Sequence, residues 1–280
     1  MAEAATTTPR SPAEASGISV VVPALDLEHI VGRTVEALRN ELAPFNLPTE
    51  VIVVDDGSTD ATARVVTSLM GRTAGVRLLR NRRNFGKALS VYLGILAARH
   101  SHVFFTDGDL PFSAGCYRQV AEELVRGERV VIASRRMPES QILVRMDVLG
   151  YAARRHFVGV TFNRLVRLLL SLSFSDTQCG LKGFDRATAL TLFERTRLGG
   201  FLFDVELLLA ARAEEIRVVE VPVCVEYRDF KSSIQLASSS ARMLRGLLEI
   251  WNLERRGLYK LPNPEMTPER VGSWTEEVTA

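Results

Sequence analysis

The residues of this sequence best suited to chemistry are two aspartates in the stretch HVFFTDGDLPF, residues 102–112. Asp107 and Asp109 follow an apolar run that is typical of a buried strand, and one glycine separates them. Mg²⁺ and Mn²⁺ prefer oxygen ligands and usually bind one or two carboxylates together with phosphates and water. Gly108 would let the backbone turn sharply enough for both carboxylates to reach one ion. A plain turn that ends a strand fits the local pattern equally well.

A second acidic pair ends the apolar run EVIVVDD. One of the two carboxylates, Asp55 or Asp56, could accept hydrogen bonds from a base or a ribose. The alternative is a capped turn, because Ser58 and Thr59 follow at the place where a helix N-cap is expected. Both interpretations hold together if Asp56 belongs to the turn and Asp55 faces a ligand.

A basic loop follows in the stretch NRRNFGKALS. It places Asn84, Gly86 and Lys87 directly before a predicted helix, and a helix N-terminus next to a lysine suits a ligand that carries phosphate. The spaced glycines and the Lys-Ser/Thr pair of a P-loop are missing. On local grounds, a solvated basic loop is an equally good interpretation.

The elements that must position these residues alternate between strand and helix. Predicted strands lie at 18–24, 50–58, 75–81, 102–107 and 129–135, and predicted helices lie at 27–42, 61–70, 87–99 and 114–126. This alternation predicts an α/β fold with a mainly parallel sheet that helices cover on both faces. Ligands bind beyond the carboxyl ends of such strands. The polar residues predicted at that rim are Pro23, Asp55, Asp56, Asp107, Asp109 and Arg135.

The pattern changes after Arg136. A basic amphipathic stretch over 144–172 is followed by DTQCGLKGF, and then by predicted helices at 187–195 and 204–214, a strand at 216–227 and a basic amphipathic helix at 238–256. Basic amphipathic helices can lie in the headgroup region of a membrane. Core packing with arginines at the rim explains the same pattern.

Composition and charge exclude several classes of protein. A formal net charge of +2 argues against a generic nucleic-acid binder, whose affinity comes largely from many phosphate contacts. The three cysteines are far apart and predict a reducing compartment. The first 17 residues lack the features of a signal peptide, and no uncharged apolar run approaches the ~20 residues of a membrane span. We therefore expect a cytoplasmic protein with a disordered lead over 1–17 and a loose tail over 261–280.

The order of these motifs resembles glycosyltransferase family 2, whose members have the GT-A fold and use a nucleotide-sugar donor. In the first half, the resemblance is carried by a strand that ends in proline, by DDGSTD, by NFGK and by a strand that ends in DGD. In the second half, it is carried by SRRM, FNRLVRLLLSLSFSDTQCGLKGF and FLFDVELLL. The second group is similar to the branch that makes polyprenyl-phosphate sugars, which includes dolichyl-phosphate mannose synthase and dolichyl-phosphate β-glucosyltransferase. DTQCG is similar to the glucosyl end of that branch. The resemblance implies a GT-A domain over 18–260, with a nucleotide-sugar half (18–136) and an acceptor half (137–260).

The resemblance also implies a role for each residue that matches a family motif. The nucleotide sugar would contact Pro23, Ala24, Glu28, Asp55, Asp56, Lys87, Asp107 and Gly108. Asp107 and Asp109 would hold Mg²⁺ or Mn²⁺. The acceptor phosphate would contact Arg135, Arg155, Gln178 and Lys231, and the catalytic group would comprise Asp109, Asp176 and Asp204. Departures from the family pattern at Leu25-Asp26, Pro111, Gly159 and Lys231-Ser232-Ser233 bear on donor and acceptor preference.

The implied activity is transfer of a hexose from UDP-glucose, or as second choice GDP-mannose, to a polyprenyl phosphate with inversion. The expected location is the cytoplasmic face of a membrane, with the membrane surface and a separate membrane protein as further partners and with no nucleic acid. One alternative is a family 2 transferase for a soluble or polysaccharide acceptor, against which Arg135, Arg155 and DTQCG argue. Another is a non-catalytic nucleotide-sugar-binding protein, which the intact Asp107 and Asp109 disfavour.

Overall fold

The computed structural model describes residues 15–109, 112–113, 115–144, 149–197, 200–227 and 236–279. Its strands are β1 (Ala15–Ala24), β2 (Thr49–Asp55), β3 (Val76–Asn81), β4 (His100–Phe105), β5 (Val130–Ser134), β6 (Gln141–Val144), β7 (Lys182–Asp185), β8 (Val219–Pro222), β9 (Cys224–Tyr227) and β10 (Thr275–Val278). Its α-helices are α1 (Val31–Leu42), α2 (Thr62–Met70), α3 (Lys87–Ala97), α4 (Cys116–Val125), α5 (Leu149–Leu170), α6 (Arg186–Phe193), α7 (Phe203–Ala213), α8 (Leu236–Arg255) and α9 (Pro268–Val271). Short 3₁₀ turns lie at Ala43–Phe45, Gly200–Leu202, Leu258–Lys260, Pro264–Met266 and Gly272–Trp274.

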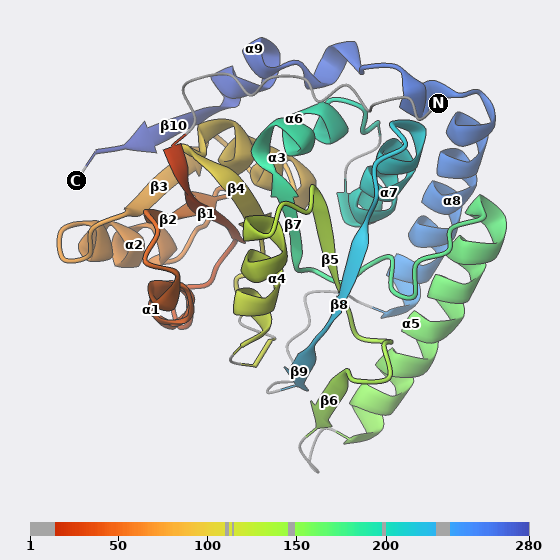
Figure 1. Ribbon diagram of the computed structural model, residues 1–280, viewed down its shortest axis with the longest axis horizontal. Helices are drawn as coiled ribbons and strands as arrows, with labels where there is room; N and C mark the ends of the chain where they lie inside the picture. Colours follow the sequence, from red (N-terminus) through yellow and green to blue (C-terminus); the bar gives the residue numbers. More distant parts are fainter. Residues whose placement is uncertain are drawn as a thin grey trace, which may run out of the picture.

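Within these described ranges, one eight-stranded sheet runs through the molecule in the order β10-β3-β2-β1-β4-β7-β5-β8 (Figure 1). Strands β1 to β4 pair in parallel, as do β5 and β8. Strand β7 runs antiparallel to both β4 and β5, and β10 runs antiparallel to β3 at the edge. The predicted α/β fold with a mainly parallel sheet is therefore confirmed.

Two hydrophobic layers hold the sheet between its helices. Because successive side chains of a strand point to opposite faces, Val21 packs with α3, α6 and α7 on one face. Val20 and Val22 pack on the other face with α1, α2 and α4. The strand order reverses between β1 and β4, and this switch point is where a parallel sheet opens a crevice at the carboxyl ends of its strands.

The second half of the chain differs from the prediction in its strands. The predicted strand 216–227 is two short strands, because β8 joins the large sheet while β9 pairs with β6 in a separate two-stranded sheet. Pro222, the last residue of β8, has no N–H to continue the ladder. Strand β7 was not predicted, since it has only four residues and one of them is glycine.

Both ends of the chain also differ from the prediction. Residues 15–17 belong to β1 instead of the disordered lead, and residues 1–14 lie outside the described residues. The tail predicted to be loose over 261–280 contains α9 and β10 instead. The reason is long-range: Glu277 on β10 forms a two-point ion pair with Arg77 on β3, with contacts of 2.7 and 2.9 Å. Among the described helices, none combines the length and the apolar character that a bilayer crossing needs.

Candidate active site

The residues predicted to form a polar rim do lie at the carboxyl ends of neighbouring strands. Pro23 and Ala24 end β1, and Ala24 is in register with Asp55 at the end of β2. Asp107 follows β4 and Arg135 follows β5. The structure therefore gathers the residues predicted to contact the donor around the switch point between β1 and β4.

The turn at residues 107–109 is more than a surface turn, because Gly108 is buried against β1. A Cβ on Gly108 would lie 3.0 Å from the carbonyl oxygen of Pro23 and 2.5 Å from Leu27 Cδ1. The hydroxyl of Thr34 on α1 also donates to the Gly108 carbonyl at 2.7 Å. Glycine lets the backbone lie this close, because any larger residue would require Leu27 and the Pro23 carbonyl to shift. The turn thus fixes the direction in which Asp107 and Asp109 leave β4.

Asp107 is paired with Lys87, the first residue of α3. Lys87 Nζ lies 2.6 Å from Asp107 Oδ1, and the lysine side chain is 24% exposed. Burial works against the charge of Lys87, but the carboxylates of Asp107 and Asp204 outweigh it and raise the pKa of the lysine above its ordinary value. Lys87 is therefore a fixed cation at the rim.

The same rim contains the residues that could hold a divalent metal. Asp109 is exposed and Asp107 partly so, which leaves both carboxylates accessible from the solvent side. No three His, Cys, Asp or Glu side chains come together as a metal centre in the parts of the chain that the structure describes. Mg²⁺ at phosphate sites commonly takes only one or two protein carboxylates and receives its other ligands from phosphates and water. Asp107 and Asp109 fit a site of that kind.

Asp55 and Asp56 have different environments. Asp55 is fully buried and accepts hydrogen bonds from the Ser58 amide at 2.9 Å and from Arg80 Nε at 3.3 Å. Asp56 accepts from the backbone amides of Phe85 at 2.9 Å and Gly86 at 2.8 Å. The carboxylate of Asp56 thereby holds the loop that leads into α3. The carboxylate that closes the turn at 55–58 is that of Asp55, which has no exposed surface, so the predicted division of roles is reversed.

The predicted cap of α2 is wrong. The N-cap is Ala61, whereas Ser58 and Thr59 lie before it and make no cap hydrogen bond to the helix. Glu28 accepts from the Ala61 amide at 2.7 Å, and Asp60 accepts from the Thr62 amide at 2.8 Å. Two carboxylates therefore replace the hydroxyl cap that the sequence indicated, and Glu28 connects the end of β1 to α2.

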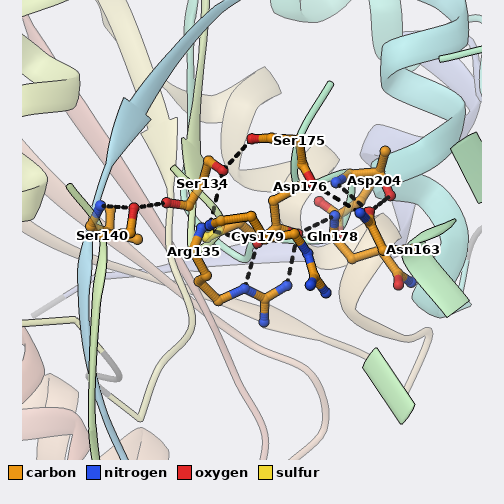
Figure 2. Close-up of polar contacts among 12 residues, drawn as sticks. Ser134, Arg135, Ser140, Asn163, Ser175, Asp176, Gln178, Cys179 and Asp204 are labelled. Carbon is orange, nitrogen blue, oxygen red and sulfur yellow. Dashed lines mark hydrogen bonds and ion pairs between the residues drawn. The ribbon is translucent and has the colours of Figure 1, made fainter. Parts of the chain in front are cut away.

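Arg135, which was predicted to contact the acceptor, forms a two-point ion pair with Asp176 (Figure 2). Arg135 Nε and Nη2 donate to the two carboxylate oxygens at 2.6 and 2.9 Å, and the Arg135 and Gln178 amides donate to them at 3.1 Å. Asp176 is fully buried. Burial alone would raise the pKa of Asp176, but the charge and hydrogen bonds of Arg135 outweigh it and lower the pKa to about 2. Asp176 is thus a permanent anion that orients the arginine.

The loop around Asp176 is also fastened to α5. Asn163 donates to the Ser175 carbonyl at 2.8 Å and accepts from the Thr177 amide at 3.0 Å (Figure 2). The hydroxyl of Ser134 at the end of β5 lies 2.6 Å from that of Ser175. These contacts fix α5 relative to the rim. Arg155 lies on α5, but its side chain is outside the described residues, as is the whole of Lys231.

Sequence reasoning gave no role to one buried charged residue at the rim. Lys182, at the start of β7, has no exposed surface, and its Nζ donates to Asp204 Oδ1 and to the Cys179 carbonyl, both at 2.6 Å. A Cβ on the neighbouring Gly180 would lie 2.0 Å from Asp107 Oδ2. Segment 176–182 therefore contacts Arg135, Asp204 and Asp107. Its one sequence signal is the lysine two residues after DTQCG.

Comparison with known proteins identifies the family of the chain. Residues 19–189 match the family model described as glycosyl transferase family 2. A dolichyl-phosphate β-glucosyltransferase of Dictyostelium discoideum is 31% identical over 88% of this chain and 79% of its own length. One of Drosophila melanogaster is 32% identical over 84% and 74%, and one of Trichomonas vaginalis is 30% identical over 78% and 64%.

Solved structures support the fold. Glucosyl-3-phosphoglycerate synthase of Mycobacterium tuberculosis, in complex with Mn²⁺, UDP-glucose and phosphoglyceric acid, superposes with a TM-score of 0.56. The alignment covers 89% of this chain and 82% of that one at 17% identity. The complex of the same synthase with UDP also gives 0.56, at 18% identity. At this identity the likeness concerns the fold.

Proposed function

The chain belongs to glycosyl transferase family 2, and we propose that it transfers glucose from UDP-glucose to the phosphate of a dolichyl or other polyprenyl phosphate. One observation carries the proposal: segment 176–182 holds Arg135 through Asp176 and packs against Asp107 through Gly180. A transferase must hold an acceptor phosphate and a donor diphosphate next to each other, and this segment brings a phosphate-binding arginine beside the acidic pair. The relatives named as dolichyl-phosphate β-glucosyltransferases favour the glucosyl donor over GDP-mannose.

On the donor side, the chain provides charge and position. Lys87 carries a positive charge at the rim, where it can stabilise the negative charge that develops on the departing diphosphate. Asp107 and Asp109 would hold Mg²⁺ or Mn²⁺, which when bound supplies Lewis-acid stabilisation of the same leaving group. Asp55, at the end of β2, has no exposed surface, so it would serve the nucleoside site by holding the Ser58 amide and Arg80.

On the acceptor side, the planar guanidinium of Arg135 suits a phosphate, because its fork can donate two parallel hydrogen bonds. Asp176 binds the Nε–Nη2 edge of the guanidinium and keeps it in one orientation, so the phosphate would meet the Nη1–Nη2 edge. A phosphate oxygen is ionised near neutral pH, so its attack on the anomeric carbon needs no strong general base, and positioning supplies most of the catalysis. A single displacement inverts the anomeric centre and gives a β-linked product from an α-linked donor.

The lipid acceptor also requires a surface that can contact a membrane. Helices α5 and α8 lie side by side along one flank of the molecule (Figure 1). Phe157 and Leu168 on α5 are 71% and 80% exposed, and Leu244 and Leu248 on α8 are also exposed. The exposed arginines among them are Arg154, Arg164, Arg167, Arg242 and Arg245. Apolar side chains mixed with arginines suit the headgroup region of an anionic membrane, and we place the reaction at the cytoplasmic face.

The test is transfer of labelled sugar to a short polyprenyl phosphate, with UDP-glucose and GDP-mannose offered separately, first with Mg²⁺ and then with a chelator. We expect metal-dependent transfer from UDP-glucose. Asp109→Asn should abolish it. Asp185→Asn should not, because Asp185 lies at the other end of β7, where it caps α6 by accepting from the Thr188 amide. Asparagine caps a helix as well as aspartate does.

The other outcomes are equally informative. If transfer occurs only from GDP-mannose, the proposed donor UDP-glucose is wrong and GDP-mannose takes its place. Binding of UDP-glucose without any lipid labelling would remove the acceptor assignment and favour a soluble or polysaccharide acceptor. Lipid transfer that requires added membrane protein would assign docking to a separate partner instead of to α5 and α8.

A further inference from the structure

We propose that the C-terminal segment, residues 264–278, fixes the donor loop, residues 82–86, in the conformation that sets Lys87 against Asp107, and that Trp274 is the positioning residue. The inference rests on the proposed function only in assigning this loop to the nucleotide sugar. The C-terminal segment lies beyond residues 19–189, which the family model matches, so family membership assigns it no role.

The C-terminal segment is firmly attached to the sheet. Strand β10 pairs with β3 over four residues from Thr275 to Val278. Arg77 on β3 binds both carboxylate oxygens of Glu277, and it also donates to the buried Glu50 at 2.8 Å. Val271 on α9 is fully buried in the core. The C-terminal segment is therefore an integral part of the fold, attached through a core residue and through an ion pair at the edge of the sheet.

The contact between this segment and the donor loop is aromatic. The rings of Trp274 and Phe85 stack with their centroids 5.3 Å apart and their planes 20° from parallel. The Arg82 amide donates to the Trp274 carbonyl at 3.3 Å, and the Arg83 guanidinium lies 5.0 Å from the centre of the Phe85 ring. The outer side of the loop is therefore held at Arg82 and at Phe85.

The inner side of the loop is held by the active site. The Phe85 and Gly86 amides both donate to the carboxylate of Asp56. Gly86 has φ of 91° and ψ of 160°, a conformation that side chains other than glycine rarely adopt. Lys87 follows at once and begins α3. Phe85 thus lies between Trp274 and Asp56. Because only Gly86 separates Phe85 from Lys87, a shift of Phe85 would also displace Lys87 at the rim.

A purely structural role for Trp274 would give a different result. If the indole only stabilised the fold, its removal would lower the melting temperature and leave donor affinity unchanged. If it positions the loop, its removal weakens donor binding even in the folded protein and leaves acceptor binding alone, because Arg135 and Asp176 lie at the ends of other elements.

The experiment compares Trp274→Ala, Trp274→Phe and Glu277→Gln with wild type. The last variant is the matched control, since it weakens the attachment of β10 at Arg77 and leaves the stack on Phe85. UDP and UDP-glucose are titrated into each protein in the presence of Mn²⁺, and calorimetry measures the binding. Trp274→Ala should bind both about 3- to 10-fold more weakly, which is the fold-change that the free energy of one aromatic pair produces. Trp274→Phe should restore the affinity, and Glu277→Gln should keep it. The KM for polyprenyl phosphate should stay at the wild-type value in all three.

Amide hydrogen exchange tests the positioning without a nucleotide. Exchange at Phe85 and Gly86 should become faster in Trp274→Ala and stay at the wild-type rate in Glu277→Gln. Wild-type donor affinity and unchanged exchange in Trp274→Ala would overturn the inference, as would an equal loss in Glu277→Gln. If wild type binds neither UDP-glucose nor GDP-mannose, the proposed function falls, and the exchange rates still decide whether Trp274 fixes the loop.

Discussion

Replacing Asp176 with asparagine tests the pair at the centre of the acceptor side. The substitution keeps the size of the side chain and removes the charge that Arg135 grips at two points. Asp176 is fully buried and the Arg135 side chain is 27% exposed, so little solvent screens the pair. The loss of the charge should therefore be measurable both in stability and in acceptor binding.

The magnitude follows from the pKa of Asp176, which the arginine lowers from 3.8 to about 2. A carboxyl whose pKa is lowered in the folded state stabilises that state above its unfolded pKa, and the stabilisation disappears as the pH falls through the folded pKa. The difference corresponds to roughly 2–3 kcal/mol at pH 7. At pH 3, between the two pKa values, about half of this should remain.

Urea unfolding of wild type and Asp176→Asn at pH 7, 5 and 3 measures the difference. We expect the variant to be less stable by roughly 2–3 kcal/mol at pH 7 and 5 and by about half as much at pH 3. Asp185→Asn, at the N-cap of α6, should match wild type at pH 7. In the transfer assay, Asp176→Asn should raise the KM for polyprenyl phosphate more than that for the donor. Equal stability at pH 7, or a difference that does not shrink on acidification, would refute the reasoning.

Two further substitutions examine the segment between the donor and acceptor sides. Lys182→Met leaves Asp204 as a buried carboxylate without its lysine, so urea unfolding should show a loss of about 3–5 kcal/mol, whereas Lys182→Met with Asp204→Leu should recover most of it. A double variant no more stable than the single one would contradict that expectation. Gly180→Ala places a methyl group 2.0 Å from Asp107 Oδ2 and should lower Mn²⁺-dependent turnover by about 10- to 100-fold with an unchanged circular dichroism spectrum. Wild-type turnover would show that the carboxylate moves aside freely.

The fold could be predicted where sequence signals are local. The β-branched runs of β1 to β5 and the helices between them are long enough for periodicity to reveal them, and the rim residues follow from the rule for parallel sheets. Strand β7 has only four residues, and its stability comes from antiparallel pairing with β4 on one side and β5 on the other. Its pairing partners are distant in sequence, so no local pattern indicated it.

The site could be predicted in part for the same reason. Asp55 ends β2, Asp107 lies two residues after β4 and Arg135 directly follows β5, so position alone indicated that they belong to the rim. Lys182 finds its carboxylate partner 22 residues away, and Trp274 stacks on a phenylalanine in another half of the chain. No local sequence pattern indicates contacts between residues that are so far apart in the chain. The tail was predicted to be loose because its local composition is polar and proline-rich, while its order comes from contacts such as that of Arg77 with Glu277.

The direction of β7 explains why one short segment can serve both sides of the site. An antiparallel strand begins at the edge of the sheet where its parallel neighbours end, so the residues that precede β7 lie at the carboxyl ends of β4 and β5. Asp176 thereby reaches Arg135 after β5, and Gly180 reaches Asp107 after β4. A parallel strand in the same place would carry its preceding residues to the opposite edge, away from the crevice. The antiparallel direction of one interior strand thus lets a single segment contact both Arg135 and Asp107.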